Sequence, residues 1–314
     1  MPSIKTIKQR IKSVKSTSQI TKAMEVVSAT KMRRSQEFAI RARPYAVASL
    51  ELLHNLLRRS PVRPALLTSR LVKKSALLVV TSDKGLAGAF NANVLRRAEE
   101  WHAAHPDSAI FTIGKKAREY FERRGVPLLE SYSEFGDFTE LSQTLPISDR
   151  LISGFLNNEW DEVDATYTNF RTTLLQEATM KKILPVTEKG IEEVVAGILP
   201  QHGKYAADST SRDSSASPQN DHIKGRYNYE YRFEPSANEI IDALVPQLIR
   251  LHIHHIILES NASEHSARMI AMKNASDNAK GIITDLTLVY NKVRQAGITR
   301  ELTEITAGKE ALEG

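Results

Sequence analysis

Residues 3–43 contain neither glycine nor proline, and this run constrains the fold more than any other feature of the chain. Those two residues are the most costly in a helix interior, so their absence predicts one continuous helix. Such a helix is about 60 Å long. That exceeds what a compact domain of this mass needs, so we expect the helix to project from the rest of the molecule.

The apolar residues of this first helix begin as a heptad seam. Spacings of 3, 4 and 3 residues, the repeat of a coiled coil, separate Ile4, Ile7, Ile11 and Val14. The seam is then expected to break at Ser18 and to resume in another phase. The residues that would carry the second phase are Ile20, Met24 and Val27.

The C-terminal end shows a longer heptad pattern. Ser236 can cap a helix beginning near Ala237, with Glu239 at the spacing of a capping box. Further along, steps of 3 and 4 residues alternate without a break through Met269, Met272, Ser276, Ala279, Ile283, Leu286, Tyr290 and Val293. The small residues in this seam permit the close approach of a partner helix.

Prolines should bend both terminal helices, at Pro44 and at Pro246. After Pro44, a second apolar stretch continues to about Arg59. Its leucines are Leu50, Leu53, Leu56 and Leu57.

Two long striped helices, one at each end of a single chain, suggest an intramolecular antiparallel coiled coil. The alternative is a pair of separate amphipathic helices, each lying on the central domain. The length of the first helix favours the coiled coil.

The middle of the chain alternates strand and helix patterns. Strands are expected at 76–81, 110–113, 126–129 and 163–168. Helices are expected at 91–104, 115–124 and 148–158, the last capped by Ser148. Such alternation predicts a mostly parallel sheet. The segment 182–186 contains Pro185 and is expected at an edge of that sheet.

Residues 207–221 lack large apolar side chains, so we expect a flexible loop there. Aromatic residues then alternate with polar ones, the pattern of a final strand before the C-terminal helix. These aromatic residues are Tyr227, Tyr229, Tyr231 and Phe233.

Composition excludes several kinds of chemistry. The chain has no cysteine, which rules out disulfides, thiolate nucleophiles and cysteine-bound metals. No stretch approaches the ~18 consecutive apolar residues of a membrane span. No leader segment is recognisable, so a cytoplasmic, bacterial-type protein is expected. Residues 1–60 carry 13 Lys/Arg against 3 Asp/Glu, which implies an acidic partner.

A glycine-containing turn, residues 81–91, follows the first strand at the place where phosphate-binding loops occur. It is not a P-loop, because Lys84 precedes both glycines, and it does not have the G-x-G-x-x-G spacing of a dinucleotide fingerprint. We interpret it as a structural turn that depends on Asp83, Gly85 and Gly88. A nucleotide-binding enzyme remains the alternative, although no catalytic set stands out.

Two other sites have simpler explanations. On a helix, His252, His255 and Glu259 share a face, but no fourth metal ligand is evident. They are therefore expected to be surface residues. The basic first helix could bind nucleic acid, but no aromatic residue precedes Phe38. A coiled coil whose charged face meets acidic protein loops is the preferred interpretation.

Several segments resemble the gamma subunits of F-type ATP synthases. The N-terminal segment 10–32 is similar to that family's first signature, and segments 267–279 and 289–305 to its C-terminal ones. The turn at 82–91 also fits. The resemblance covers nearly the whole chain. The loop at 207–221 is longer than in many bacterial members, and thiol regulation is excluded here because cysteine is absent.

The resemblance implies a non-catalytic rotor shaft without a cofactor, present in one copy per complex. Its partners would be a ring of three alpha and three beta subunits, the epsilon subunit and the membrane c-ring, with no nucleic acid. The complex would lie on the cytoplasmic face of the bacterial inner membrane, with this chain as a peripheral part. Rotation of the shaft would couple proton flow to conformational changes at the catalytic beta subunits.

The resemblance also implies contact residues. The contacts with beta-subunit loops would come from Lys22, Met24, Arg268, Gln295 and Thr299. A bearing tip in an apolar sleeve would include Leu302, Ile305 and Leu312.

The expected architecture is therefore a central Rossmann-like α/β domain with a long antiparallel two-helix coiled coil formed by the terminal segments. The expected divisions are a first shaft helix (1–60), the α/β domain (70–200), a Ser/Asp-rich loop (201–226), and a final strand with the second shaft helix (227–314).

Overall fold

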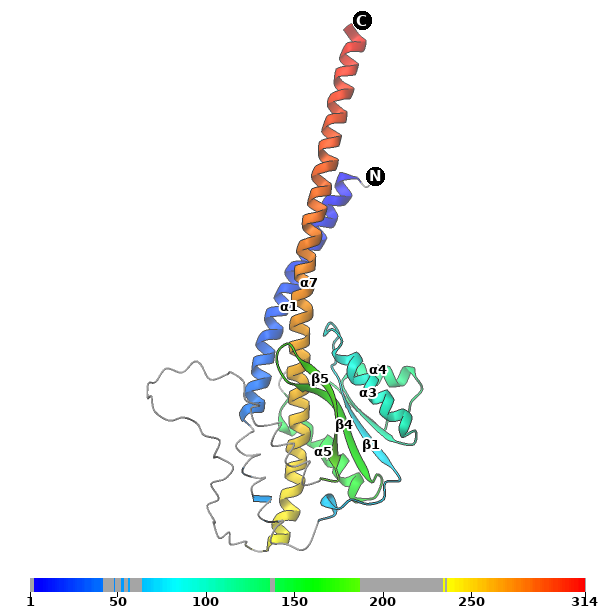
Figure 1. Cartoon of the computed structure of the whole chain (residues 1–314), viewed down its shortest axis with the longest axis vertical. Helices are drawn as coiled ribbons and strands as arrows, with labels where there is room; N and C mark the ends of the chain where they lie inside the picture. The colour runs from blue at the N-terminus through cyan, green and yellow to red at the C-terminus, as the bar shows by residue number, and fades with distance from the viewer. Residues whose placement is uncertain are drawn as a thin grey trace, which may run out of the picture.

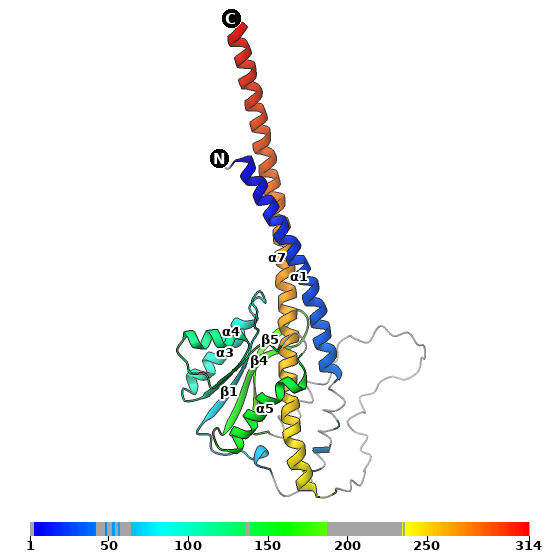
Figure 2. The ribbon, with the colours of Figure 1, turned by 180° about the vertical axis from the view of Figure 1, so that it is seen from behind.

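The structure is a computed structural model that describes residues 3–41, 64–135, 139–186 and 236–313, with single positions at 48, 52, 53, 56 and 234. Two long helices, α1 (Ile4–Arg41) and α7 (Ala237–Glu313), form a rod (Figure 1). An α/β domain lies beside the lower half of α7. Figure 2 shows from behind that α7 continues well beyond the N-terminal end of α1.

The α/β domain contains one five-stranded sheet in the order β3-β2-β1-β4-β5. Its strands are β1 (Ser75–Val80), β2 (Ala109–Ile113), β3 (Glu130–Tyr132), β4 (Glu162–Phe170) and β5 (Gln176–Leu184). The first four run parallel, and β5 pairs antiparallel with β4 at the edge. The predicted mostly parallel sheet with an edge segment near Pro185 is therefore confirmed.

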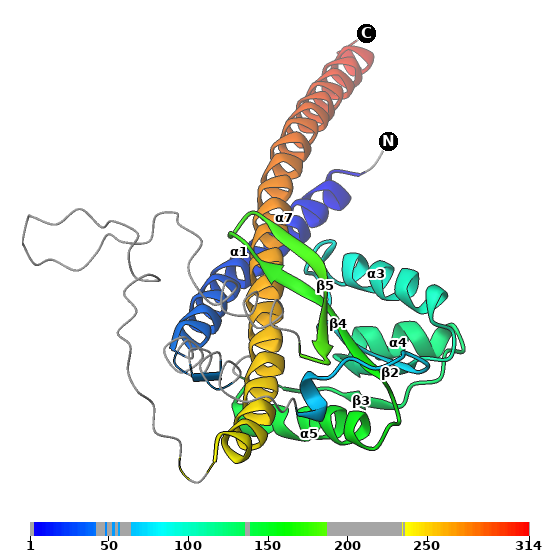
Figure 3. The same cartoon turned by 60° about the horizontal axis from the view of Figure 1, so that its bottom comes forward.

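Helices cover both faces of the sheet, as the parallel strands require. On one face lie α3 (Phe90–Ala104) and α4 (Lys115–Arg123) (Figure 3). On the other face lie α5 (Leu141–Leu156), the short 3-10 helix η1 (Ala65–Leu67) and the lower part of α7. The shaft helix α7 is thus also a core helix of the α/β domain.

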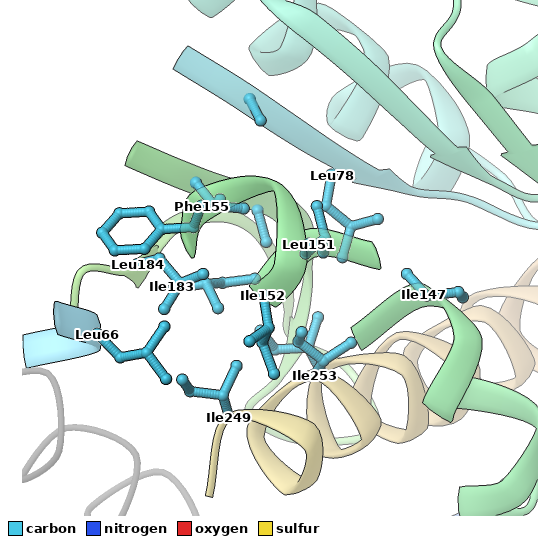
Figure 4. Close-up of a cluster of buried hydrophobic side chains, with 14 of the residues drawn as sticks. Leu66, Leu78, Ile147, Leu151, Ile152, Phe155, Ile183, Leu184, Ile249 and Ile253 are labelled. Atoms are coloured by element: carbon cyan, nitrogen blue, oxygen red, sulfur yellow. The ribbon is translucent and has the colours of Figure 1, made fainter. Parts of the chain in front are cut away.

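The larger hydrophobic core joins the sheet to α7. In Figure 4, Ile249 and Ile253 of α7 lie against Ile152 of α5, while Ile183 and Leu184 come from β5. All five are buried. Fully burying one such side chain stabilises a fold by about 1.5–3 kcal/mol, so this core fixes the base of the rod to the domain.

Two expected boundaries in the domain are wrong. The third strand begins at Glu130, not at 126, and the preceding residues form a connection in which Leu129 N–H donates to Ile110 O at 2.9 Å. Helix α5 begins at Leu141 and is capped by Glu140, so Ser148 lies inside it and does not cap it. The helix continues through Pro146, which has no N–H to donate to the carbonyl oxygen four residues earlier.

The terminal helices form the predicted antiparallel coiled coil. Ile4, at the start of α1, lies against Gly297, and Ser18 lies against Ser276. The predicted α7 seam is buried or partly buried throughout, from Met269 to Val293. The two helices therefore wind around each other and do not pack separately on the domain.

The expected break in the α1 seam is wrong. The inward positions keep steps of 4 and 3 along the whole helix: Ile7, Ile11, Val14, Ser18, Thr21, Glu25, Ser28, Met32 and Ser35. The residues expected to carry a second phase include Ile20 and Val27, which are 58% and 52% exposed. The seam uses small and polar residues here, because the two backbones approach closely.

Helix α7 is continuous over 77 residues, a length of about 115 Å. The hydroxyl of Ser236 accepts the backbone N–H of Glu239 at 3.3 Å, which confirms the predicted cap. Pro246 lies within the helix and does not end it.

One window of α7 has a mean hydropathy of 1.2, enough by length and composition for a membrane span. The core helix of a folded domain meets the same criterion. Ile241, Val245, Ile249 and Ile253 are each no more than 1% exposed within the α/β domain.

Several expectations fall outside the described residues. These are the kink at Pro44, the leucines at 50 and 57, the loop at 207–221 and the strand from Tyr227 to Phe233. Of that second apolar stretch, the described residues Leu53 and Leu56 are buried in the larger core.

Candidate functional site

The turn after β1 is held together by one carboxylate. Asp83 Oδ1 accepts the backbone N–H of Lys115, at the first residue of α4, and Asp83 Oδ2 accepts that of Glu134, both at 2.9 Å. Asn91 Oδ1 accepts the N–H of Ser82 at 3.0 Å. Side chains of the turn thus satisfy the donors at the carboxyl ends of the strands.

The turn after β1 lies where phosphate-binding loops occur, and these hydrogen bonds explain why it carries no phosphate-binding motif. In the sheet, β1 lies between β2 and β4, so the chain continues first on one side of β1 and later on the other. In open α/β sheets, ligands bind at such a switch point, beside the carboxyl ends of the strands. A helix N-terminus there attracts an anion. In this chain the anion at α4 is the carboxylate of Asp83, which favours the structural interpretation of the turn.

The two glycines of the turn differ in their roles. Gly88 has φ +57°, a conformation that L side chains rarely adopt, so the backbone favours glycine there. A Cβ added at Gly85 would meet no atom within 4 Å. Leu86 adopts φ +64° and is exposed on the outside of the turn.

Arg268 lies between α7 and this turn. Its side chain donates to the carbonyl oxygens of Lys84 and Gly85 at 3.2 Å each, and Nη2 lies 2.6 Å from Oε1 of Glu264. The residue is 8% exposed. The structure therefore gives Arg268 partners within its own chain.

A groove of about 560 Å³ lies beside Arg268, between the rod and the turn. Residues from α1, the turn and α7 line it, among them Ile20, Met24, Val27, Lys84, Leu86, Ile257 and Arg268. Lys22 lies outside this lining and is paired with Glu25 at 2.9 Å. Three apolar residues of α1 that lie outside the coiled-coil seam, Ile20, Met24 and Val27, thus line this groove.

The remaining expected contact residues lie higher on the rod. Gln295 and Thr299 are exposed, one turn apart, and the Thr299 hydroxyl donates to the Gln295 carbonyl at 3.0 Å. Beyond Gly297, which faces Ile4, α7 continues without α1. There Leu302 and Ile305 are 59% and 68% exposed. Leu312 lies in the last turn of α7, and its side chain is outside the described residues.

The histidines of α7 are not surface residues, contrary to expectation. His255 is buried, and its Nδ1 lies 3.8 Å from Oε1 of Glu259. Burial, which removes water from the imidazole, lowers the pKa of His252 to about 3, and the charges of Lys181 and His255 add to this effect. Among the described residues no three His, Cys, Asp or Glu side chains are grouped to hold a metal ion.

Sequence reasoning missed a second contact between α7 and the domain. Ser263 donates its hydroxyl to Thr168 O at 3.1 Å, and Ser266 donates to Thr173 O at 2.8 Å. The signal was present in the sequence, because Ser260, Ser263 and Ser266 recur every three residues along the helix. All three are buried.

Comparison with known proteins decides the family. A family model described as ATP synthase matches residues 3–312. A curated ATP synthase gamma chain of Roseiflexus castenholzii is 40% identical over 319 residues, covering 99% of each chain. The chain belongs to the ATP synthase gamma chain family. A gamma chain of Geotalea daltonii is also 40% identical over 319 residues, covering 100% of both chains.

Solved structures of similar shape support the gamma chain fold. A chain of the Euglena gracilis mitochondrial ATP synthase, OSCP/F1/c-ring, in rotational state 3, has a TM-score of 0.63 at 18% identity. It covers 98% of this chain, and this chain covers 94% of it. A chain from the central stalk and c-ring of the Tetrahymena thermophila enzyme has a TM-score of 0.57 at 20% identity. At such identities the likeness concerns the fold alone.

Proposed function

We propose that this gamma chain is the central rotor shaft of an F-type ATP synthase, non-catalytic itself and coupling proton flow to nucleotide chemistry in partner subunits. The observation that carries the proposal is the lopsided rod. Two helices of unequal length wind together, and α7 alone continues beyond Gly297 to Glu313. A rod of this kind reaches far from its base and presents a different face in each direction.

The mechanism follows from symmetry. A two-helix rod has no threefold axis, so inside a ring of three alpha and three beta subunits it touches each beta subunit differently. Unequal contacts give unequal free energies to the open and closed beta conformations, and hence unequal nucleotide affinities. Rotation of the rod exchanges the three environments in turn.

The groove beside Arg268 is the proposed site for one beta-subunit lever. Its wall presents Met24 together with Ile20 and Val27, which an amphipathic partner segment can cover. Lys22, two residues before Met24 and on the exposed side of α1, supplies positive charge for an acidic partner. Higher on the rod, Gln295 and Thr299 are placed to make polar contacts with beta-subunit loops.

The end of α7 is the proposed bearing. Ile298, Leu302 and Ile305 form a stripe at steps of 4 and 3 that continues past the end of α1. An apolar stripe without a partner helix fits an apolar sleeve, and Leu312 extends the sequence pattern. Exposed apolar stripes of this kind mark interaction surfaces.

The α/β domain is the proposed attachment to the epsilon subunit and the c-ring. It lies at the opposite end of the rod from the bearing (Figure 1). The chain would then be a peripheral part of a membrane-bound complex on its cytoplasmic face, in one copy, without cofactor or nucleic acid.

Rotation of single complexes tests this function. The complex is assembled with its alpha and beta partners, the ring is fixed to a surface, and a probe is attached to the α/β domain. We expect the probe to rotate in one direction when ATP is added. ATP hydrolysis by the assembled complex with a stationary probe would contradict the proposal. Micromolar ATP binding by the isolated chain would contradict its non-catalytic role.

A further inference from the structure

We infer that α7 is gripped by a two-sided polar collar, and that Arg268 is the positioning residue through which torque passes between the α/β domain and the rod. The collar consists of Arg268 with the turn carbonyls on one side, and Ser263 and Ser266 with the β4–β5 hairpin on the other. The inference rests on the proposed rotor function and assigns a role within the chain to a residue expected to contact the ring.

The first side of the collar is the guanidinium contact. Arg268 donates to two consecutive carbonyl oxygens of the turn, those of Lys84 and Gly85. Glu264 holds the same guanidinium one helical turn earlier on α7. Hydrogen bonds from an ionised donor are roughly twice as strong as neutral ones, and burial limits screening by solvent.

The second side of the collar is the serine contact. The hydroxyls of Ser263 and Ser266 donate to the carbonyl oxygens of Thr168 and Thr173. Gln176 Nε2 donates to Ser266 Oγ at 3.2 Å, which fixes the hydroxyl from the other strand of the hairpin. Both serines are fully buried, so these bonds do not exchange readily with water.

The two sides lie on nearly opposite faces of α7. At 100° per residue, the midpoint of Ser263 and Ser266 is roughly 150° around the helix from that of Glu264 and Arg268. Forces applied at two opposed points form a couple, which is the arrangement that transmits a twist. The close-packed core below also transmits strain to α7, and the collar adds hydrogen bonds of fixed geometry to that attachment.

The collar lies at the level of α7 where the α/β domain meets the two-helix rod. The next buried positions along α7, Met272 and Ser276, belong to the seam with α1, and Ser276 donates to Ser18 O in that helix. Above the collar the rod therefore consists of the two helices alone. A twist applied through the α/β domain enters the rod at this level or below it.

The donors of Arg268 are already engaged. Nε and Nη2 of the guanidinium face the two turn carbonyls and Glu264, and Nη1 lies 3.5 Å from Nδ1 of His265 in a residue that is only 8% exposed. Direct contact with a ring subunit would require some of these bonds to break. The exposed Gln295 and Thr299 have no such competing role.

The first test uses the reconstituted complex in vesicles. Arg268→Ala should retain ATP hydrolysis and lose proton pumping per ATP hydrolysed, because the rod slips or flexes relative to the domain. Arg268→Lys, which keeps the charge but not the paired donors, should recover part of the pumping. Lys280→Ala, a matched change at an exposed cation of α7, is the control. Full pumping in Arg268→Ala would overturn the inference.

Hydrogen exchange supplies a readout within the chain. Loss of the charged hydrogen bonds should raise exchange at the turn amides near Leu86 by about tenfold, given the net worth of such bonds. The amides of α3 beyond the turn should change little. Unchanged exchange at the turn would show that the contact holds nothing in place.

A cross-link separates the collar from a contact with the ring. The chain has no cysteine, and a Cβ at Gly85 meets no neighbour, so Gly85→Cys with Arg268→Cys can be joined by a short bis-maleimide. If Arg268 acts through the turn, linking should restore pumping although the guanidinium is gone. If linked and unlinked complexes pump equally poorly, Arg268 acts on another subunit and the inference fails.

Failure of the collar and failure of the rotor function are distinguishable. If the unmodified complex shows no rotation of the probe, the rotor function itself is refuted. If the unmodified complex rotates and pumps, and the linked variant stays uncoupled, only the collar is refuted.

Discussion

Ser276 donates its hydroxyl to the carbonyl oxygen of Ser18, at 3.4 Å, across the interface between α7 and α1. A side chain this small at the seam lets the two backbones approach closely enough for a side chain of one helix to reach the main chain of the other. The same part of α1 presents Thr21 and Ser28 to the seam. The middle of the rod is therefore narrow, which suits a shaft that turns inside a ring.

Enlarging Ser276 should loosen the rod. Leucine at this position overfills a closely packed seam, which costs about 1–3 kcal/mol. We expect Ser276→Leu to lower the midpoint of chemical unfolding measured by circular dichroism. Asn278→Leu, an exposed position two residues further on, is the control. Equal midpoints for the two variants would contradict close packing at Ser276, because they would show that the seam accommodates leucine.

Two helical glycines provide an opposed pair of predictions. A Cβ at Gly154, in α5, would lie 2.0 Å from Trp160 Cζ2, whereas one at Gly281, in α7, would meet nothing. We expect Gly154→Ala to destabilise the α/β domain by about 1–3 kcal/mol through overpacking. Gly281→Ala should stabilise α7 by about 0.5–1 kcal/mol, because alanine loses less backbone entropy. Denaturant titration of both variants measures the difference, and a stabilised Gly154→Ala would contradict the packing at Trp160.

Removing the carboxylate of Asp83 should weaken the turn after β1. Asp83→Ala leaves the N–H groups of Lys115 and Glu134 without their acceptor, at a cost of about 1–3 kcal/mol where solvent cannot replace it. The unfolding midpoint and the proteolysis rate of the turn should both report this loss. Asp107→Ala, at an exposed turn of the same domain, should be nearly neutral. A neutral Asp83→Ala would mean that water satisfies both donors.

The regular parts of this fold could be predicted from sequence, because the spacing of apolar residues there reflects which side chains are buried. The α7 seam from Met269 to Val293 and the strand at Ser75–Val80 follow their patterns closely. The α1 seam was predicted wrongly beyond Val14 because hydrophobicity and burial diverge there. All of the inward positions beyond Val14 except Met32 are polar, while Ile20 and Val27 are exposed.

Local boundaries and polar contacts were harder to predict. Strand β3 is short and begins at Glu130, so its composition gives little signal. Ser148 has the type of residue that caps helices, yet its hydroxyl donates to Thr144 O within α5. The family resemblance implies that Arg268 contacts a partner subunit, and nothing in the sequence shows that the carbonyls of Lys84 and Gly85 lie beside it within the chain. Contacts to backbone atoms of a distant segment depend on the tertiary fold.

Acid should destabilise the chain through the histidines of α7. The pKa of His252 falls from 6.5 to about 3, and burial also lowers the pKa of His254. Below pH 6.5 the unfolded chain therefore binds protons that the folded chain does not bind, so the free energy of unfolding falls as the pH decreases. Asp164 acts with the opposite sign, because burial raises its pKa above 3.8, so its contribution to stability grows as the pH falls from that raised pKa towards 3.8.

The measurement is denaturant unfolding between about pH 6.5 and about pH 5, above the range of most carboxylates. His252→Gln should reduce the loss of stability over this range, because glutamine takes up no proton in either state. Lys181→Gln should produce a smaller reduction, since the Lys181 charge helps to lower the pKa of His252. A pH dependence that is the same in His252→Gln as in the unmodified chain would show that His252 accepts its proton in the folded state.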